Sequence, residues 1–136
     1  MDYSRSERLM PQEEMLETKS KERHLTIGLP RESSYDENRI ALVPEAVALI
    51  VENGHRVLME SGAGNRAHFS DKEYSEAGAE ILDQPDEVFK SDILLKISPV
   101  NEDEIGMMRE RQLLVSTLNT THRNREYFKD LSRKKI

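Results

Sequence analysis

The sequence contains no cysteine and no tryptophan, and aromatic residues make up only 5% of its 136 positions. The missing thiols exclude disulfides, thiolate metal ligands and a cysteine nucleophile. No apolar run approaches the roughly 20 residues of a membrane-spanning helix, and the charged start of the chain is unlike a secretory signal. We therefore expect a cytoplasmic protein with no membrane segment in this chain.

Positive charge is also scarce. Twenty Lys and Arg residues stand against 26 Asp and Glu, which gives a net charge of −6 and a pI near 5.3. Binding to nucleic acid needs a basic face for the phosphates, so we expect no nucleic-acid partner. The histidines, at positions 24, 55, 68 and 122, lack the spacing with carboxylates that is typical of a metal site, and we expect no metal.

Short apolar runs alternate with amphipathic segments from residue 24 onward. The expected strands are 25–29, 56–60, 80–82, 93–97 and 113–118, and the expected helices are 44–53, 70–78, 85–90, 102–109 and 123–133. Crossovers of this length connect parallel strands. We therefore predict one α/β domain over residues 24–136, with an open, largely parallel sheet and helices on both faces. Residues 1–23 have only a thin apolar face and are expected to form an N-terminal helical arm or leader.

The glycines of Gly62-Ala63-Gly64 follow an expected strand and invite comparison with the dinucleotide fingerprint G-x-G-x-x-G. The next expected helix begins only at Ser70, so no helix N-terminus stands where a pyrophosphate would bind. We interpret the segment as a glycine-rich turn and expect no cofactor-binding residue in this chain.

Arg39 and Lys96 each flank an apolar strand segment. A charge in such a place must reach solvent, a partner or a ligand. In open α/β sheets ligands bind outside the carboxyl ends of the strands, which is where Lys96 is expected. Two interpretations stay open. The residues could bind a carboxylate, or they could be a snorkelling lysine and a structural arginine–carboxylate pair.

Several ordered motifs resemble a known family. Residues 27–32 (IGLPRE), 37–44 (ENRIALVP), 54–64 (GHRVLMESGAG) and 92–97 (DILLKI) resemble the N-terminal domain of alanine dehydrogenases and of the proton-translocating nicotinamide nucleotide transhydrogenase α subunit. The likeness extends from about residue 25 to residue 118.

The resemblance implies a flavodoxin-like substrate domain of an NAD-dependent oxidoreductase, truncated before the NAD-binding domain. The implied reaction converts L-alanine to pyruvate and ammonia, so the partners would be a small amino acid and its 2-oxo acid, with NAD bound by the absent domain. The parent enzyme would be a homo-oligomer. We expect this chain by itself to be inactive. The alternatives are the N-terminal part of a transhydrogenase α subunit and a non-catalytic binding module of the same fold.

The resemblance also carries expectations for single residues. Arg39 matches the arginine that binds the substrate carboxylate in alanine dehydrogenases, and its planar guanidinium suits that task. Lys96 and Ser98 are further substrate-binding candidates, although the family has a second lysine where this chain has Ser98. Asn119 stands where the family has a catalytic histidine. Asparagine cannot transfer a proton at neutral pH, so the catalytic residue stays unknown.

Overall fold

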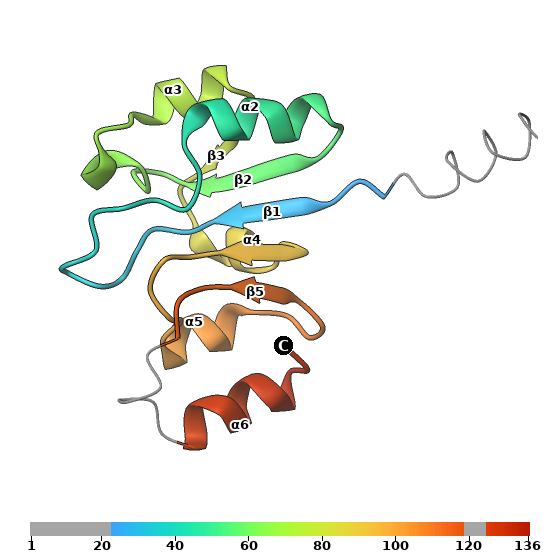
Figure 1. The fold of residues 1–136 in the computed structure, drawn as a ribbon. Helices are drawn as coiled ribbons and strands as arrows, with labels where there is room; N and C mark the ends of the chain where they lie inside the picture. Colours follow the sequence, from blue (N-terminus) through green and yellow to red (C-terminus); the bar gives the residue numbers. More distant parts are fainter. Residues whose placement is uncertain (1–22, 119–124) are drawn as a thin grey trace, which may run out of the picture.

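The computed structural model describes residues 23–118 and 125–136, so most of the expected N-terminal arm lies outside the described residues. Within these two ranges, five strands and six helical segments follow one another (Figure 1). They are β1 (Thr26–Leu29), α2 (Pro44–Glu52), β2 (Arg56–Glu60), η1 (a 3-10 turn, Asn65–Ala67), α3 (Asp71–Glu76), β3 (Glu80–Leu82), α4 (Pro85–Phe89), β4 (Ile93–Leu95), α5 (Glu102–Met107), β5 (Leu113–Val115) and α6 (Arg125–Arg133).

The strands form one sheet in the order β3-β2-β1-β4-β5. Every neighbouring pair is parallel, which confirms the predicted α/β class. The order is not the 2-1-3-4-5 order of flavodoxin; it follows the 3-2-1-4-5 order of dinucleotide-binding folds. The likeness to flavodoxin therefore holds for the layered architecture and not for strand order. The reason is the connection after β3, which returns across the sheet to place β4 beside β1.

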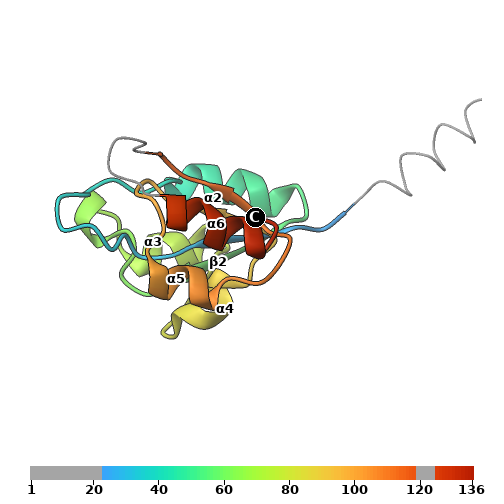
Figure 2. The ribbon, with the colours of Figure 1, turned by 90° about the horizontal axis from the view of Figure 1, so that it is seen from below.

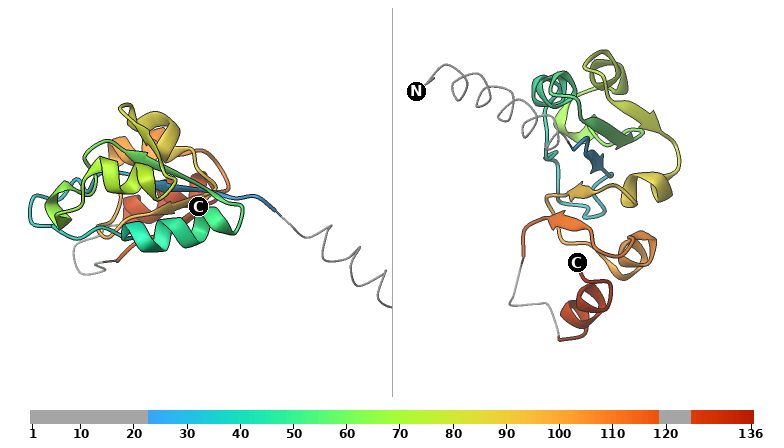
Figure 3. Two further views of the ribbon diagram at one scale, coloured as in Figure 1. Left: turned by 90° about the horizontal axis from the view of Figure 1, so that it is seen from above. Right: turned by 90° about the vertical axis from the view of Figure 1, so that its right-hand side faces the viewer.

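Helices cover both faces of the sheet. The right panel of Figure 3, which looks nearly along the strands, shows α2 and α3 on one side and α4 and α5 on the other. Two apolar clusters fill these layers. The first contains Ile27, Leu29, Val47, Val57, Met59, Ala63, Tyr74 and Ala79, and the second contains Phe89, Leu94, Val100, Ile105, Met108, Tyr127 and Leu131. Gly28 permits the second layer to pack closely, because a Cβ there would lie 2.4 Å from the Val88 carbonyl oxygen of α4.

Local sequence signals set the ends of the helices. Helix α2 begins at Pro44, where the missing N–H costs nothing, and it is followed by Gly54 with a φ of 86°. Helix α3 begins with a capping box in which Ser70 and Glu73 exchange side-chain and backbone hydrogen bonds. Backbone hydrogen bonding from the N-cap also lowers the pKa of Glu73. Each predicted helix within the described residues is present, with ends shifted by a few residues.

Both strands of the second half end earlier than expected. The strand β4 stops at Leu95 and β5 at Val115, so Lys96 and Ser98 belong to the loop after β4 and not to the sheet itself. The loop after β1 is long and projects past the carboxyl ends of the strands (Figure 2). Within residues 23–118 and 125–136, each helix is too short or too polar to cross a bilayer.

Candidate functional site

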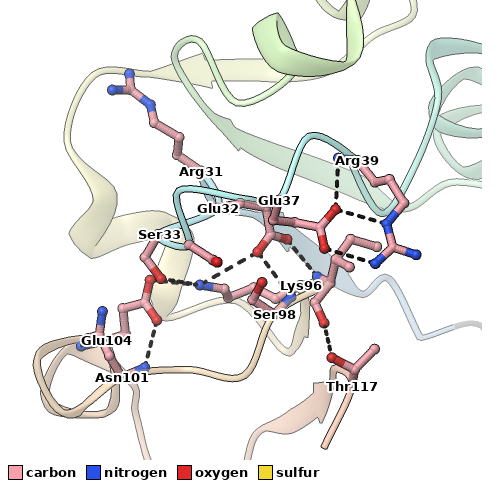
Figure 4. Close-up of polar contacts among 12 residues, drawn as sticks. Arg31, Glu32, Ser33, Glu37, Arg39, Lys96, Ser98, Asn101, Glu104 and Thr117 are labelled. Carbon is pink, nitrogen blue, oxygen red and sulfur yellow. Dashed lines mark hydrogen bonds and ion pairs between the residues drawn. The ribbon is translucent and has the colours of Figure 1, made fainter. Parts of the chain in front are cut away.

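The carboxyl ends of β1 and β4 lie side by side in the sheet, yet the chain leaves them toward opposite faces. This is the topological switch point at which open α/β sheets bind ligands. The loop after β1 contains Arg31 to Arg39, and the loop after β4 contains Lys96 to Ser98 (Figure 4). A cavity of ≈ 240 Å³ opens between the loop after β1 and the turn after β2, and it is lined by Arg31, Glu32, Glu37, Arg39, Gly62, Ala63, Asn65 and Arg66.

Arg39 reaches this cavity with a side chain that is 72% exposed. Its Nε and Nη2 groups donate to the two carboxylate oxygens of Glu37 at 2.8 and 2.9 Å. Its backbone N–H donates to Glu37 Oε1 as well, at 2.9 Å. Hydrogen bonding from Arg39 lowers the pKa of Glu37 to about 2, and the paired carboxylate raises the pKa of Arg39. Both groups are therefore charged at neutral pH.

Other arginines fix the loop that carries Arg39. Arg66, which belongs to η1, donates through Nη1 to the carbonyl of Ser34 at 2.8 Å and to that of Glu37 at 3.3 Å. Arg31 points away from Arg39 toward the turn after β2 (Figure 4), where its Nη2 group donates to the Ser61 carbonyl. These cations hold the loop to β2 and to its turn. Arg66 is bonded to loop carbonyls, whereas Arg31, with a 59% exposed side chain, lines the cavity together with Arg39.

Lys96 lies in a very different environment. Its side chain has no exposed surface, and its Nζ donates to Glu104 Oε1 at 2.7 Å and to Ser33 Oγ at 3.3 Å. Glu32 Oε2 lies 4.0 Å away. Glu104 belongs to α5, where its other oxygen accepts the backbone N–H of Asn101 in a capping box. The lysine thus ties the loop after β4 to the start of the following helix.

Glu32 joins the two loops across the switch point. Its side chain, 7% exposed, accepts the backbone N–H of Ile97 at 2.6 Å and that of Ser98 at 3.1 Å. The carboxylate therefore fixes the backbone on which Ser98 stands and adds negative charge near Lys96. The two hydrogen bonds that this buried carboxylate accepts are strong, because the acceptor is charged.

The structure brings only part of the expected set into one place. Arg39 lines the cavity, whereas Lys96 and Ser98 are absent from its lining, and the Lys96 ammonium is sealed behind Glu104. Asn119 lies outside the described residues. Sequence reasoning missed Glu32, Glu37 and Glu104. For Glu104 the spacing from Asn101 was an available signal, since it matches a capping box.

The turn after β2 does not fit a dinucleotide. The Gly62 N–H donates to Asp71 Oδ1 at 2.8 Å, so it is not available to a phosphate. A Cβ at Gly64 would lie 2.6 Å from Tyr74 Cε2, which shows that this glycine packs against the protein's own core. The turn continues into η1 and not into a longer helix that could present its N-terminus. No group of three or more potential metal ligands occurs among the described residues.

Comparison with known proteins places the chain in a family. The family model for the alanine dehydrogenase/PNT N-terminal domain matches residues 28–136. Alanine dehydrogenase from Staphylococcus saprophyticus is 37% identical over 95 residues, which cover 70% of this chain and 26% of that protein. Alanine dehydrogenase 2 from Staphylococcus aureus is 39% identical over the same coverage.

Solved structures agree. An L-alanine dehydrogenase superposes with a TM-score of 0.76 at 32% sequence identity. The match covers 80% of this chain and 30% of the chain of that enzyme. A transhydrogenase from Sinorhizobium meliloti superposes with a TM-score of 0.74 at 24% sequence identity. The match covers 81% of this chain and 32% of the transhydrogenase chain, and it shows a likeness of fold alone. The chain spans about a quarter of the length of the curated relatives it matches. It belongs to the family of alanine dehydrogenase/PNT N-terminal domains.

Proposed function

We propose that this chain is the substrate-binding domain of an NAD-dependent alanine dehydrogenase, and that Arg39 binds the carboxylate of L-alanine or pyruvate. One observation carries the proposal: an exposed guanidinium with unused N–H groups faces a cavity at the carboxyl ends of the strands. A ligand carboxylate at that guanidinium would receive charge-assisted hydrogen bonds with defined geometry.

The neighbouring residues take supporting positions in this proposal. In this proposal Lys96 holds the loop after β4 through Glu104 and makes no contact with the ligand, because its side chain has no exposed surface. Within the described part of the chain the Ser98 hydroxyl has no hydrogen-bond partner, so it stays a candidate for a ligand contact. NAD would accept the hydride while bound by a part of the parent enzyme outside this chain. The parent would be a cytoplasmic homo-oligomer.

A titration of the chain with pyruvate tests the role of Arg39. We expect Arg39→Ala to raise the Kd for pyruvate by about tenfold, the effect of losing charge-assisted hydrogen bonds. The matched control is Arg56→Ala. Arg56 forms the same two-bond pair with Glu80, at 2.9 and 2.9 Å and with a 60% exposed side chain, but it stands at the amino end of β2. An equal Kd for the wild-type and Arg39→Ala chains would contradict the proposal.

A second measurement concerns the reaction. We expect no NADH formation when the chain alone is mixed with L-alanine and NAD, because its glycine turn offers no dinucleotide site. The full-length parent should form NADH from L-alanine. Hydride exchange between the two nicotinamide nucleotides without use of alanine would instead assign the parent to the transhydrogenases. Absence of both activities would favour the non-catalytic binding module.

A further inference from the structure

The orientation of the Arg39 guanidinium depends on one neighbour. Among the described residues, Glu37 is the side chain that forms hydrogen bonds with this guanidinium. The arginine side chain is 72% exposed. An exposed arginine loses rotamer freedom when it is held in one place, and little packing is present here to hold it. The acid is the fixed partner, since only 13% of its side chain is exposed.

Glu37 is itself fixed through its backbone. Its N–H donates to the Ser34 carbonyl at 3.2 Å, and its carbonyl accepts from Arg66 Nη1 at 3.3 Å. Its carboxylate also accepts the backbone N–H of Arg39, a bond that does not depend on the position of the guanidinium. The carboxylate is thus held in place by the loop, and the arginine side chain is held by the carboxylate.

The pairing leaves the useful edge of the guanidinium free. A guanidinium has five N–H groups, and Glu37 takes the one on Nε and one on Nη2. Within the described residues, the other N–H on Nη2 and the two on Nη1 have no acceptor. Nη1 and Nη2 together form the edge that offers two parallel N–H groups to a second carboxylate. A ligand can therefore bind without breaking the bonds to Glu37.

We propose that Glu37 is the positioning residue of the carboxylate site: it holds the Nε side of Arg39 so that the Nη1–Nη2 edge is presented to the ligand. This inference rests on the proposed function of Arg39. The opposite possibility is that Glu37 competes with the ligand for the guanidinium. The geometry favours positioning, because the free edge and the separate backbone bond make displacement of Glu37 unnecessary.

The test measures pyruvate affinity and guanidinium order in the full 136-residue chain. We expect Glu37→Gln and Glu37→Ala to raise the Kd for pyruvate by about three- to tenfold, the effect of ordering one side chain on binding. The Arg39 Nε–H signal in the ¹H–¹⁵N spectrum should broaden or exchange faster in both variants. Glu80→Gln is the matched control, because it removes the same kind of pair from Arg56, outside the site. It should leave the Kd unchanged.

The outcomes separate the two proposals. A lower Kd in Glu37→Gln would show competition and overturn the positioning role. An unchanged Kd in both Glu37 variants, with a raised Kd in Arg39→Ala, would overturn it too while leaving the function of Arg39 intact. If Arg39→Ala binds pyruvate like the wild type, or if the wild-type chain does not bind pyruvate at all, the proposed function fails and the positioning role fails with it.

Discussion

Two cations stand on either side of the switch point, and their environments are opposite. Arg39 lies in the loop after β1, and its side chain is 72% exposed and paired to the Glu37 carboxylate. Lys96 follows β4 with a side chain that is 0% exposed, against Glu104 at 2.7 Å and Glu32 at 4.0 Å. Each carries one positive charge on a loop that follows a parallel strand. The two side chains differ in how deeply they are buried, and this difference gives them different roles.

The difference follows from the cost of burying charge. An exposed ion pair adds little stability because water screens it, so Arg39 can exchange or add partners at small cost. A buried ammonium that loses its carboxylate stays desolvated and unpaired, which is strongly destabilising. We therefore expect changes around Lys96 to affect stability and changes around Arg39 to affect binding.

The largest effect on stability is expected for Glu104→Ala. The change leaves the Lys96 ammonium buried without its closest partner, and it should lower the free energy of unfolding by about 3–5 kcal/mol. Urea denaturation measures this. Asn101→Ala is the control, because it removes the helix cap and keeps the ion pair, and it should cost about 1 kcal/mol. Equal losses in the two variants would mean that capping, and not the ion pair, is the role of Glu104.

A smaller effect is expected for Glu32→Gln. The amide keeps one acceptor oxygen but turns an NH₂ group toward a backbone donor, so one of the N–H groups of Ile97 and Ser98 loses its acceptor. The free energy of unfolding should fall by about 1–3 kcal/mol. Hydrogen exchange should accelerate at these two amides. Unchanged exchange there would show that the two loops are not held together by Glu32.

The pH dependence of the Glu37–Arg39 pair should be shifted to acid. The pKa of Glu37 is lowered from 4.5 to about 2 by hydrogen bonding from Arg39, so the contact is complete above about pH 4.5 and is lost only as the pH falls through about 2. The ¹³C shift of the Glu37 carboxyl carbon measures this titration. In Arg39→Ala the midpoint should return toward 4.5. A midpoint near 4.5 in the wild-type chain would show that the pair does not form in solution.

The smallest effect on stability is expected for Arg39→Ala. The side chain is largely exposed, and a pair of this kind contributes little, so the urea midpoint should equal that of the wild type within error. The same variant should lose affinity for pyruvate. A clear drop in the midpoint would remove the contrast with Lys96, because Arg39 would then be a structural residue.

Local signals in the sequence were sufficient to predict the order of strands and helices. Pro44, Ser70 with Glu73, and the glycines after the helices act through the backbone within a few residues, and each lies at a helix end in the structure. The strand ends were less certain from sequence, because the apolar run 93–97 continues into a loop whose residues still pair with β5. The Lys96 N–H donates to the Val115 carbonyl at 3.0 Å, just beyond the end of β4.

The candidate site was predicted only in part. Arg39 was identified because its motif resembles that of a known family, and the open interpretation of a structural arginine–carboxylate pair describes its contact with Glu37. Whether it also binds a substrate carboxylate stays a prediction. Lys96 was expected at the mouth of a cleft, but its partners Glu32 and Glu104 lie 64 and 8 positions away along the chain and converge on it from a loop and a helix. No pattern of apolar and polar residues reports such a convergence.

The sequence by itself determined the alternation of strands and helices, the parallel class of the sheet and the family. These follow from periodicity, capping and ordered motifs, which act locally or survive as recognisable segments. Tertiary structure decided the strand order, the depth of each cation and the carboxylate that each one meets. The physical reason is that the free energy of a charge depends on how far it lies from water and on which partners surround it, and both are fixed only when distant segments pack together.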